Sequence, residues 1–270
     1  MADQVVFEGR WNAGARPPAR NGRSLVIVFC GVILLIMGEL VFQFGIAPNM
    51  RIESIVFDNT VPVPREQLLV AAGLHGKPYY FKLNLEEIKN GLEGLPPVKS
   101  AFVQKVFPDS LRIVTRGREP LATAFAETEG GILPLAFDEE GVVFLSGKDV
   151  PEQGLPVFSG LRFEGPQHGT RLPAMLKPFL QDLHKLRKSS PALFSAFSEM
   201  RVVPRGAEHF EIILYPVYYR VPVRIEGELE AERCKVILIV LDALLRDGTL
   251  DKMAEIDFRT NDIIYRLKEG

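Results

Sequence analysis

The sequence predicts an α+β protein: an N-terminal transmembrane helix, then a β-α-α-β-β module, then a larger, mostly antiparallel β domain with two helices. Three observations support this prediction. An apolar run lies near the N-terminus, residues 50–118 show strand and helix periodicities in that order, and residues 119–270 consist mainly of short strand patterns. The 270 residues suffice for about two domains.

Charge and cysteine content exclude several classes of protein. The formal net charge is −2, whereas a nucleic-acid-binding domain is usually strongly basic. The two cysteines are Cys30, inside the apolar run, and Cys234, far along the chain. Two such separated thiols support neither a disulfide framework nor a zinc site, and we expect Cys234 to be a small buried residue on a helix.

The apolar run from Leu25 to Phe44 is long enough to cross a bilayer. At about 1.5 Å per residue it covers about 30 Å, the thickness of the hydrocarbon core, so we place a transmembrane helix at residues 24–47. A cleaved signal peptide is the alternative, because Gly45-Ile46-Ala47 resembles a small-x-small cleavage site. The run is long for a signal, however, and Pro48 would follow the scissile bond, which a peptidase handles poorly.

Flanking charge predicts the orientation of this helix. Between the run and Pro64 the only basic residue is Arg51, whereas four precede the run: Arg10, Arg16, Arg20 and Arg23. Because positive residues stay in the cytoplasm, we expect the N-terminus inside and the C-terminal domains outside. Residues 1–23 lack apolar periodicity and are expected to form a disordered cytoplasmic tail. Glu39, in the last third of the helix, either snorkels to the interface or contacts a partner's membrane helix.

The first module reads as strand, helix, helix, strand, strand. Pro64 suits the start of the first helix, and Asn84 with Glu87 forms a capping pattern at the start of the second. The expected strands are residues 51–57, 101–107 and 111–116, and the expected helices are residues 64–72 and 84–95. This order gives a small α+β unit with helices on one face of a sheet.

Several strings in this module resemble the POTRA domain of the FtsQ/DivIB family of bacterial cell-division proteins. They are RIESIVF at 51–57, AAGLHGK at 71–77, PVKSAFV at 97–103, VFPDSLRIV at 106–114 and REPLA at 118–122. The last string departs slightly from the family, since Glu119 directly precedes Pro120. The resemblance implies a POTRA domain at residues 50–118.

The larger domain reads as strands interrupted by two helices. The helices are residues 172–186, with Pro178 inside and able to kink it, and residues 229–246, with Ile237, Leu238, Leu241, Leu244 and Leu245 facing inward. The expected strands are residues 120–125, 133–137, 142–145, 155–160, 200–203, 209–214, 217–225, 253–258 and 262–267. Three strings again resemble the FtsQ/DivIB family, which implies an FtsQ-type β domain at residues 119–270: DEEG at 138–141, LPVFSG at 155–160 and IDFR at 256–259.

No catalytic motif is present in the sequence. It contains no His-Glu-x-x-His, no Gly-x-Ser-x-Gly and no phosphate-binding glycine loop, and its four histidines are scattered. Glu139 and Glu140 are adjacent acids, but we interpret them as the solvated tip of a hairpin. We therefore expect a protein that is not an enzyme and has no cofactor, metal or small-molecule substrate.

The last predicted strand, residues 262–267, suggests how such a protein could bind a partner. If no further chain covers it, its edge offers unpaired backbone groups for strand addition. Ile264 and Arg266 would face one way and Ile263, Tyr265 and Leu267 the other; the alternative is that the strand merely completes the sheet. The resemblance implies that this region binds FtsB, a bitopic coiled-coil protein that pairs with FtsL.

These expectations combine into a non-catalytic, single-pass scaffold of the divisome, located in the cytoplasmic (inner) membrane at the division septum. The resemblance implies that it helps to control septal peptidoglycan synthesis. One alternative is a POTRA protein of outer-membrane assembly or secretion, although the sequence shows one such module and no room for a barrel. The other is a membrane-anchored envelope enzyme, which a buried polar pocket would support.

Overall fold

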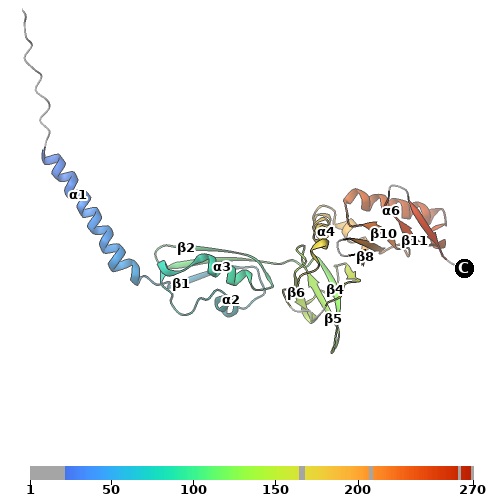
Figure 1. The fold of residues 1–270 in the computed structure, drawn as a ribbon, viewed down its shortest axis with the longest axis horizontal. Coiled ribbons are helices and arrows are strands. Elements are labelled where there is room, and N and C mark those ends of the chain that lie inside the picture. The colour runs from blue at the N-terminus through green and yellow to red at the C-terminus, as the bar shows by residue number, and fades with distance from the viewer. Residues whose placement is uncertain (1–21, 164–167, 207–208, 261–262, 269–270) are drawn as a thin grey trace, which may run out of the picture. The chain divides into compact units, whose positions relative to one another are not determined.

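The computed structural model describes residues 22–163, 168–206, 209–260 and 263–268 (Figure 1). Almost all of the predicted disordered tail, and Asp262 of the last predicted strand, lie outside these residues. The chain divides into two compact units. One holds the N-terminal helix, residues up to Arg51 and the segment Tyr79–Leu83, and the other holds Ile52–Pro78 and Asn84–Gly270.

The N-terminal helix coincides with the predicted apolar run. α1 spans Gly22–Val41 and continues into a π-helical turn, Phe42–Ile46, and a 3-10 turn, Ala47–Asn49. The segment Leu25–Ile46 is long and apolar enough to cross a membrane, and none of it is buried against the rest of the chain. Its apolar side chains are exposed in the described structure, which suits a helix surrounded by lipid.

The first module has the predicted β-α-α-β-β order. Its sheet has the strand order β1-β3-β2, with β1 parallel and β2 antiparallel to the central β3. The elements are β1 Ser54–Asn59, α2 Arg65–Ala71, α3 Leu85–Glu93, β2 Val98–Val106 and β3 Ser110–Gly117.

The helix α3 begins with the cap that the sequence predicts at Asn84. The Asn84 side chain accepts a hydrogen bond from the Glu86 backbone N–H (3.1 Å) and its amide donates to Glu87 Oε1 (2.8 Å). This cap satisfies one of the N–H groups that a helix start leaves unpaired. Gly91 lies where α3 meets α2, and a Cβ there would be 2.0 Å from the Ala71 carbonyl oxygen, so the close contact requires glycine.

The larger domain is built on a nine-stranded sheet with the order β12-β11-β10-β9-β8-β7-β4-β5-β6. The pairs β4–β7, β7–β8 and β10–β11 are parallel and the others antiparallel, so the sheet is mostly antiparallel, as predicted. The strands are β4 Ala122–Thr128, β5 Gly131–Phe137, β6 Val143–Ser146, β7 Val157–Ser159, β8 Phe197–Pro204, β9 Phe210–Pro216, β10 Val223–Glu226, β11 Met253–Asp257 and β12 Ile264–Leu267.

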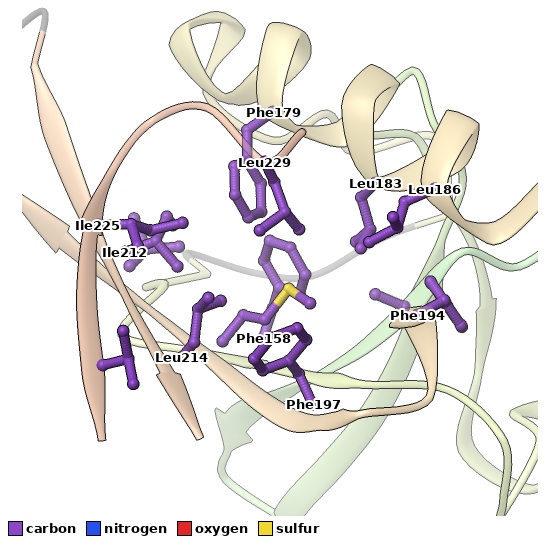
Figure 2. Close-up of a cluster of buried hydrophobic side chains, with 14 of the residues drawn as sticks. Phe158, Phe179, Leu183, Leu186, Phe194, Phe197, Ile212, Leu214, Ile225 and Leu229 are labelled. Atoms are coloured by element: carbon purple, nitrogen blue, oxygen red, sulfur yellow. The ribbon is translucent and has the colours of Figure 1, made fainter. Parts of the chain in front are cut away.

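Helices pack on one face of this sheet and enclose its core. They are α4 Lys177–Ser189, the short α5 Pro191–Phe194 and α6 Ala231–Arg246. Figure 2 shows Leu183 and Leu186 of α4 pointing into the same apolar cluster as Phe158 of β7. Phe179, also of α4, belongs to this cluster. The rings of Phe158 and Phe179 meet edge to face, with centroids 6.0 Å apart. Burial of this apolar area is the main driving force for folding of the domain.

Three predictions about this domain were wrong in detail. Pro178 does not kink a helix, because a 3-10 turn precedes α4 and Pro178 lies in the first helical turn, where a missing N–H costs nothing. The strand predicted at 217–225 is present only as β10, which begins directly after Pro222. Leu245 is exposed, and the buried residues of α6 are Cys234, Ile237 and Leu241.

Candidate functional site

The strand β12 forms one edge of the nine-stranded sheet. Within the described residues it pairs only with β11, antiparallel, and no strand lies on its other side. The side chains of Ile264, Tyr265 and Leu267 are 58 %, 56 % and 57 % exposed, and Ile263 and Arg266 are exposed as well. The five residues that the sequence predicted for partner binding therefore lie together at an open edge; Ile263 directly precedes the strand.

The pairing with β11 decides which way each β12 side chain faces. Tyr265 lies opposite Ile256, and Leu267 opposite Met253. Ile256 and Met253 are buried in the domain core, so Tyr265 and Leu267 are on the core side of the sheet, yet remain exposed. They extend the apolar interior beyond the area that the described chain covers.

Two contacts hold the end of β12. The backbone N–H of Lys268 donates to the Lys252 carbonyl oxygen (2.9 Å), and the Lys268 ammonium donates to the Asp251 carbonyl oxygen (2.7 Å). Both acceptors belong to the 3-10 turn Leu250–Lys252 that precedes β11. The strand is thus ordered by its neighbour along one edge and its C-terminal end.

A network of charges joins β9, β10 and β11 on the opposite face of the sheet. The Glu211 carboxylate accepts hydrogen bonds from Arg205 (3.0 Å), Arg224 (2.7 Å) and Arg259 (2.5 Å). Arg224 also donates from Nε and Nη2 to the two carboxylate oxygens of Glu255 in β11, at 2.8 and 3.0 Å. Bidentate pairs of this kind fix geometry as well as charge. The network therefore fixes β11, on which β12 is aligned.

The pKa values of two acids in this network are lowered. Burial acts to raise the pKa of Glu211, but the hydrogen bonds from its three arginines outweigh burial and hold this pKa below its ordinary value. The pKa of Asp257 is lowered mainly by its hydrogen bonds from Arg259. The sequence analysis did not identify these residues. Charges at alternate positions were an available signal in β10 and β11, but the strand that carries Glu211 shows no such alternation.

In the acidic turn between β5 and β6, the structure corrects the prediction of a solvated hairpin tip. Glu139 is not at a solvated tip: it is largely buried and forms an ion pair with Lys99 of β2. Glu140 pairs with Arg118 at 2.8 Å. Asp138 is fully buried, pairs with the same arginine, and accepts from the backbone N–H groups of two residues in the turn. The partners lie 20 to 40 residues away in sequence, so a local pattern could not reveal them.

Two places bear on the alternative of an envelope enzyme. Ser146 Oγ lies 2.7 Å from Nε2 of the exposed His168. No described carboxylate bonds to this histidine, so the pair lacks the group that orients the base of a triad. A surface cavity of about 510 Å³ is lined by Glu211 and His209, among others, but the Glu211 carboxylate already has three arginine donors. Neither place has the geometry of a catalytic site.

Glu39 lies on the exposed surface of α1, one turn before the π-helical turn. Its two predicted roles, snorkelling and contact with a partner's membrane helix, both suit this position. They stay predictions.

Comparisons with known proteins agree with this architecture. Residues 50–114 match the family model described as POTRA domain, FtsQ-type. The cell division protein FtsQ of Mycobacterium tuberculosis is 30 % identical over 146 residues, which are 53 % of this chain and 45 % of the relative. FtsQ of Mycobacterium leprae is 30 % identical over 141 residues, with 50 % and 39 % covered. The cell division protein DivIB of Bacillus cytotoxicus is 23 % identical over 201 residues, with 74 % and 70 % covered.

The matched region spans less than half the length of these FtsQ relatives. A solved structure of the major extracytoplasmic domain of DivIB from Geobacillus stearothermophilus is 19 % identical and covers 48 % of this chain and 98 % of its own, with a TM-score of 0.29. Residues 50–114 thus match an FtsQ-type POTRA domain, and the FtsQ and DivIB relatives support the FtsQ/DivIB family of cell division proteins.

Proposed function

We propose that the chain is a non-catalytic, single-pass scaffold of the divisome that captures an FtsB/FtsL-type membrane partner by strand addition to β12. The supporting observation is the open edge of β12 with its exposed side chains. Main-chain hydrogen bonds supply affinity in strand addition, and alternate side chains supply specificity. With the N-terminus in the cytoplasm, both folded domains would meet such a partner outside the membrane, at the septum.

The two faces of β12 favour a partner strand of a particular pattern. On the core side, apolar partner residues would cover Tyr265 and Leu267 and continue the domain interior. On the other side Arg266 lies opposite Glu255, but that acid is held by Arg224, and Arg266 forms no ion pair with a described residue. An acidic partner residue beside Arg266 would supply the carboxylate for an ion pair with this arginine. A strand with alternating apolar and polar residues, one of them acidic, therefore fits best.

Binding by the full chain tests this proposal. The chain is reconstituted in nanodiscs and used to capture a purified FtsB/FtsL-type pair. We expect Tyr265→Glu to lower capture at least tenfold, because a carboxylate at this position would be buried beneath the partner. Tyr218→Glu is the matched control, since Tyr218 is an 85 % exposed tyrosine of the same domain. Equal capture by wild type and Tyr265→Glu would contradict the edge-strand proposal.

The same pair of variants tests the cellular role. Cells depleted of the protein should grow as filaments without septa, and the Tyr218→Glu chain should restore division where Tyr265→Glu does not. Normal division after depletion would contradict the role in the divisome. If both variants restored division in the depleted cells, the role in the divisome would stand, but β12 would not be the surface that binds the partner. The role in septal peptidoglycan synthesis is part of this proposal. It predicts that the depleted cells no longer incorporate new peptidoglycan at the septum.

A further inference from the structure

A cluster of aromatic and basic residues lies at the C-terminal end of the membrane helix. The segment Tyr79–Leu83 belongs to the same compact unit as α1, separate from the unit that contains the strands. Arg51 and Tyr79 form an isolated antiparallel bridge, and the Tyr80 N–H donates to the Met50 carbonyl oxygen at 2.9 Å. The segment is therefore held against the chain that leaves the helix.

Aromatic contacts join this segment to the apolar span itself. The Phe42 ring, in the π-helical turn that ends the span, meets the Phe81 ring edge to face, with centroids 6.3 Å apart. Phe81 is nevertheless 50 % exposed, and Phe44 in the same turn is 75 % exposed. With the span in a bilayer, exposed rings at its end lie at the level of the headgroups, where aromatic residues are enriched in membrane proteins.

Two cationic side chains, Arg51 and Lys82, lie over the ring of Tyr79. The Arg51 guanidinium carbon and the Lys82 ammonium nitrogen each lie 4.8 Å from the centroid of the Tyr79 ring, and Arg51 donates to the Tyr79 hydroxyl at 3.2 Å. Neither cation pairs with a carboxylate of the described residues, whereas many other exposed Lys and Arg side chains do. The cluster thus holds two positive charges close together without a described counter-charge.

We propose that this cluster binds anionic phospholipids in the leaflet at the C-terminal end of the span. Arg51 and Lys82 donate to lipid phosphates, and Phe81 inserts between the headgroups beside Phe42. Basic residues near the end of a span are attracted to an anionic surface, and apolar contact adds to that attraction. The anchor therefore has a second attachment beyond the helix, which holds the chain that leaves it against the membrane. This inference does not depend on the division partner.

Energy transfer from a single tryptophan tests the proposal in the full chain. The only native tryptophan is Trp11, so the variant Trp11→Phe/Phe81→Trp reports on position 81 alone. It is placed in nanodiscs of phosphatidylcholine and phosphatidylglycerol that contain a trace of either lipid carrying a dansyl group on an acyl chain. We expect about threefold more transfer to labelled phosphatidylglycerol than to labelled phosphatidylcholine. A reporter at position 218, Trp11→Phe/Tyr218→Trp, should show no such preference.

Charge variants identify the residues responsible. Adding Arg51→Gln and Lys82→Gln to the position-81 reporter should abolish the preference for phosphatidylglycerol while the tryptophan emission stays blue-shifted. The control Lys235→Gln/Arg246→Gln removes two exposed charges from α6 and should leave the preference unchanged. Equal transfer to both lipids in the reporter, or a preference that survives the Arg51 and Lys82 changes, would overturn the proposal. Circular dichroism of each variant shows that the chain remains folded.

Discussion

At the scale of single residues, the strongest constraints are buried charges whose partners are distant in sequence. Asp138 is fully buried and Arg118 nearly so, and their ion pair is supported by two backbone N–H groups that donate to the same carboxylate. Removing one member of such a pair leaves the other charge buried without compensation.

Asp138→Ala should therefore lower the free energy of unfolding by about 3–5 kcal/mol. Asp149→Ala, which removes an exposed carboxylate from the same domain, should change it by less than about 0.5 kcal/mol. Urea denaturation of the two variants measures the difference. A small effect at Asp138 would mean that the buried pair contributes little to the stability of the fold.

Glu211 predicts a pH dependence of stability. Its folded-state pKa lies below its ordinary value of 4.5 because three arginines donate to it despite its burial. The unfolded chain therefore binds the proton more readily, so the stabilisation is full above pH 4.5 and is lost as the pH falls through the folded-state pKa.

Urea denaturation between pH 7 and pH 3 measures this loss. The variant Glu211→Gln should be less stable at neutral pH and should show a shallower decline towards acid. If both proteins declined in parallel, the acid sensitivity would have to come from other carboxylates. Asp257 also has a lowered pKa, from Arg259, so a residual slope in the variant is expected.

At the scale of elements, local signals predicted most helices and strands and failed where tertiary contacts decide. The cap at Asn84 and the apolar stripe of α3 could be predicted from the sequence, because the residues that form them lie within about two helical turns of one another. By contrast, β10 is shorter than predicted and α4 begins later, since prolines near both elements decide which backbone groups join a ladder or helix. The ion pairs of Glu211 and Glu139 were not predicted, because their partners come from other elements.

The strand β12 contributes little to stability if its role is binding. Leu267→Ser should change the free energy of unfolding by less than about 0.5 kcal/mol, because the side chain is already exposed. Ile256→Ala on the neighbouring β11 should cost about 2–5 kcal/mol, because Ile256 is fully buried in the core. Thermal or urea unfolding compares them. A large loss at Leu267 would show that β12 completes the sheet rather than offering a surface.

At the scale of the whole molecule, the sequence predicted the order of the parts: an apolar helix, a β-α-α-β-β module and a mostly antiparallel sheet domain. It predicted the final strand and its five side chains as a binding edge, and the structure places them at the open end of a nine-stranded sheet. It could not predict how that edge is aligned, because the network from Glu211 to Glu255 joins three strands far apart in sequence.

The central claim is that a partner adds a strand to β12, and amide hydrogen exchange measures this directly. The full chain in nanodiscs is compared with and without its FtsB/FtsL-type partner, and exchange is followed peptide by peptide. Alternate backbone amides of Ile264–Leu267 point away from β11. We expect these amides to become protected at least tenfold on binding, because strand addition gives hydrogen-bond partners to groups that now face solvent. Protection that appears elsewhere while β12 exchanges at its free rate would contradict the account.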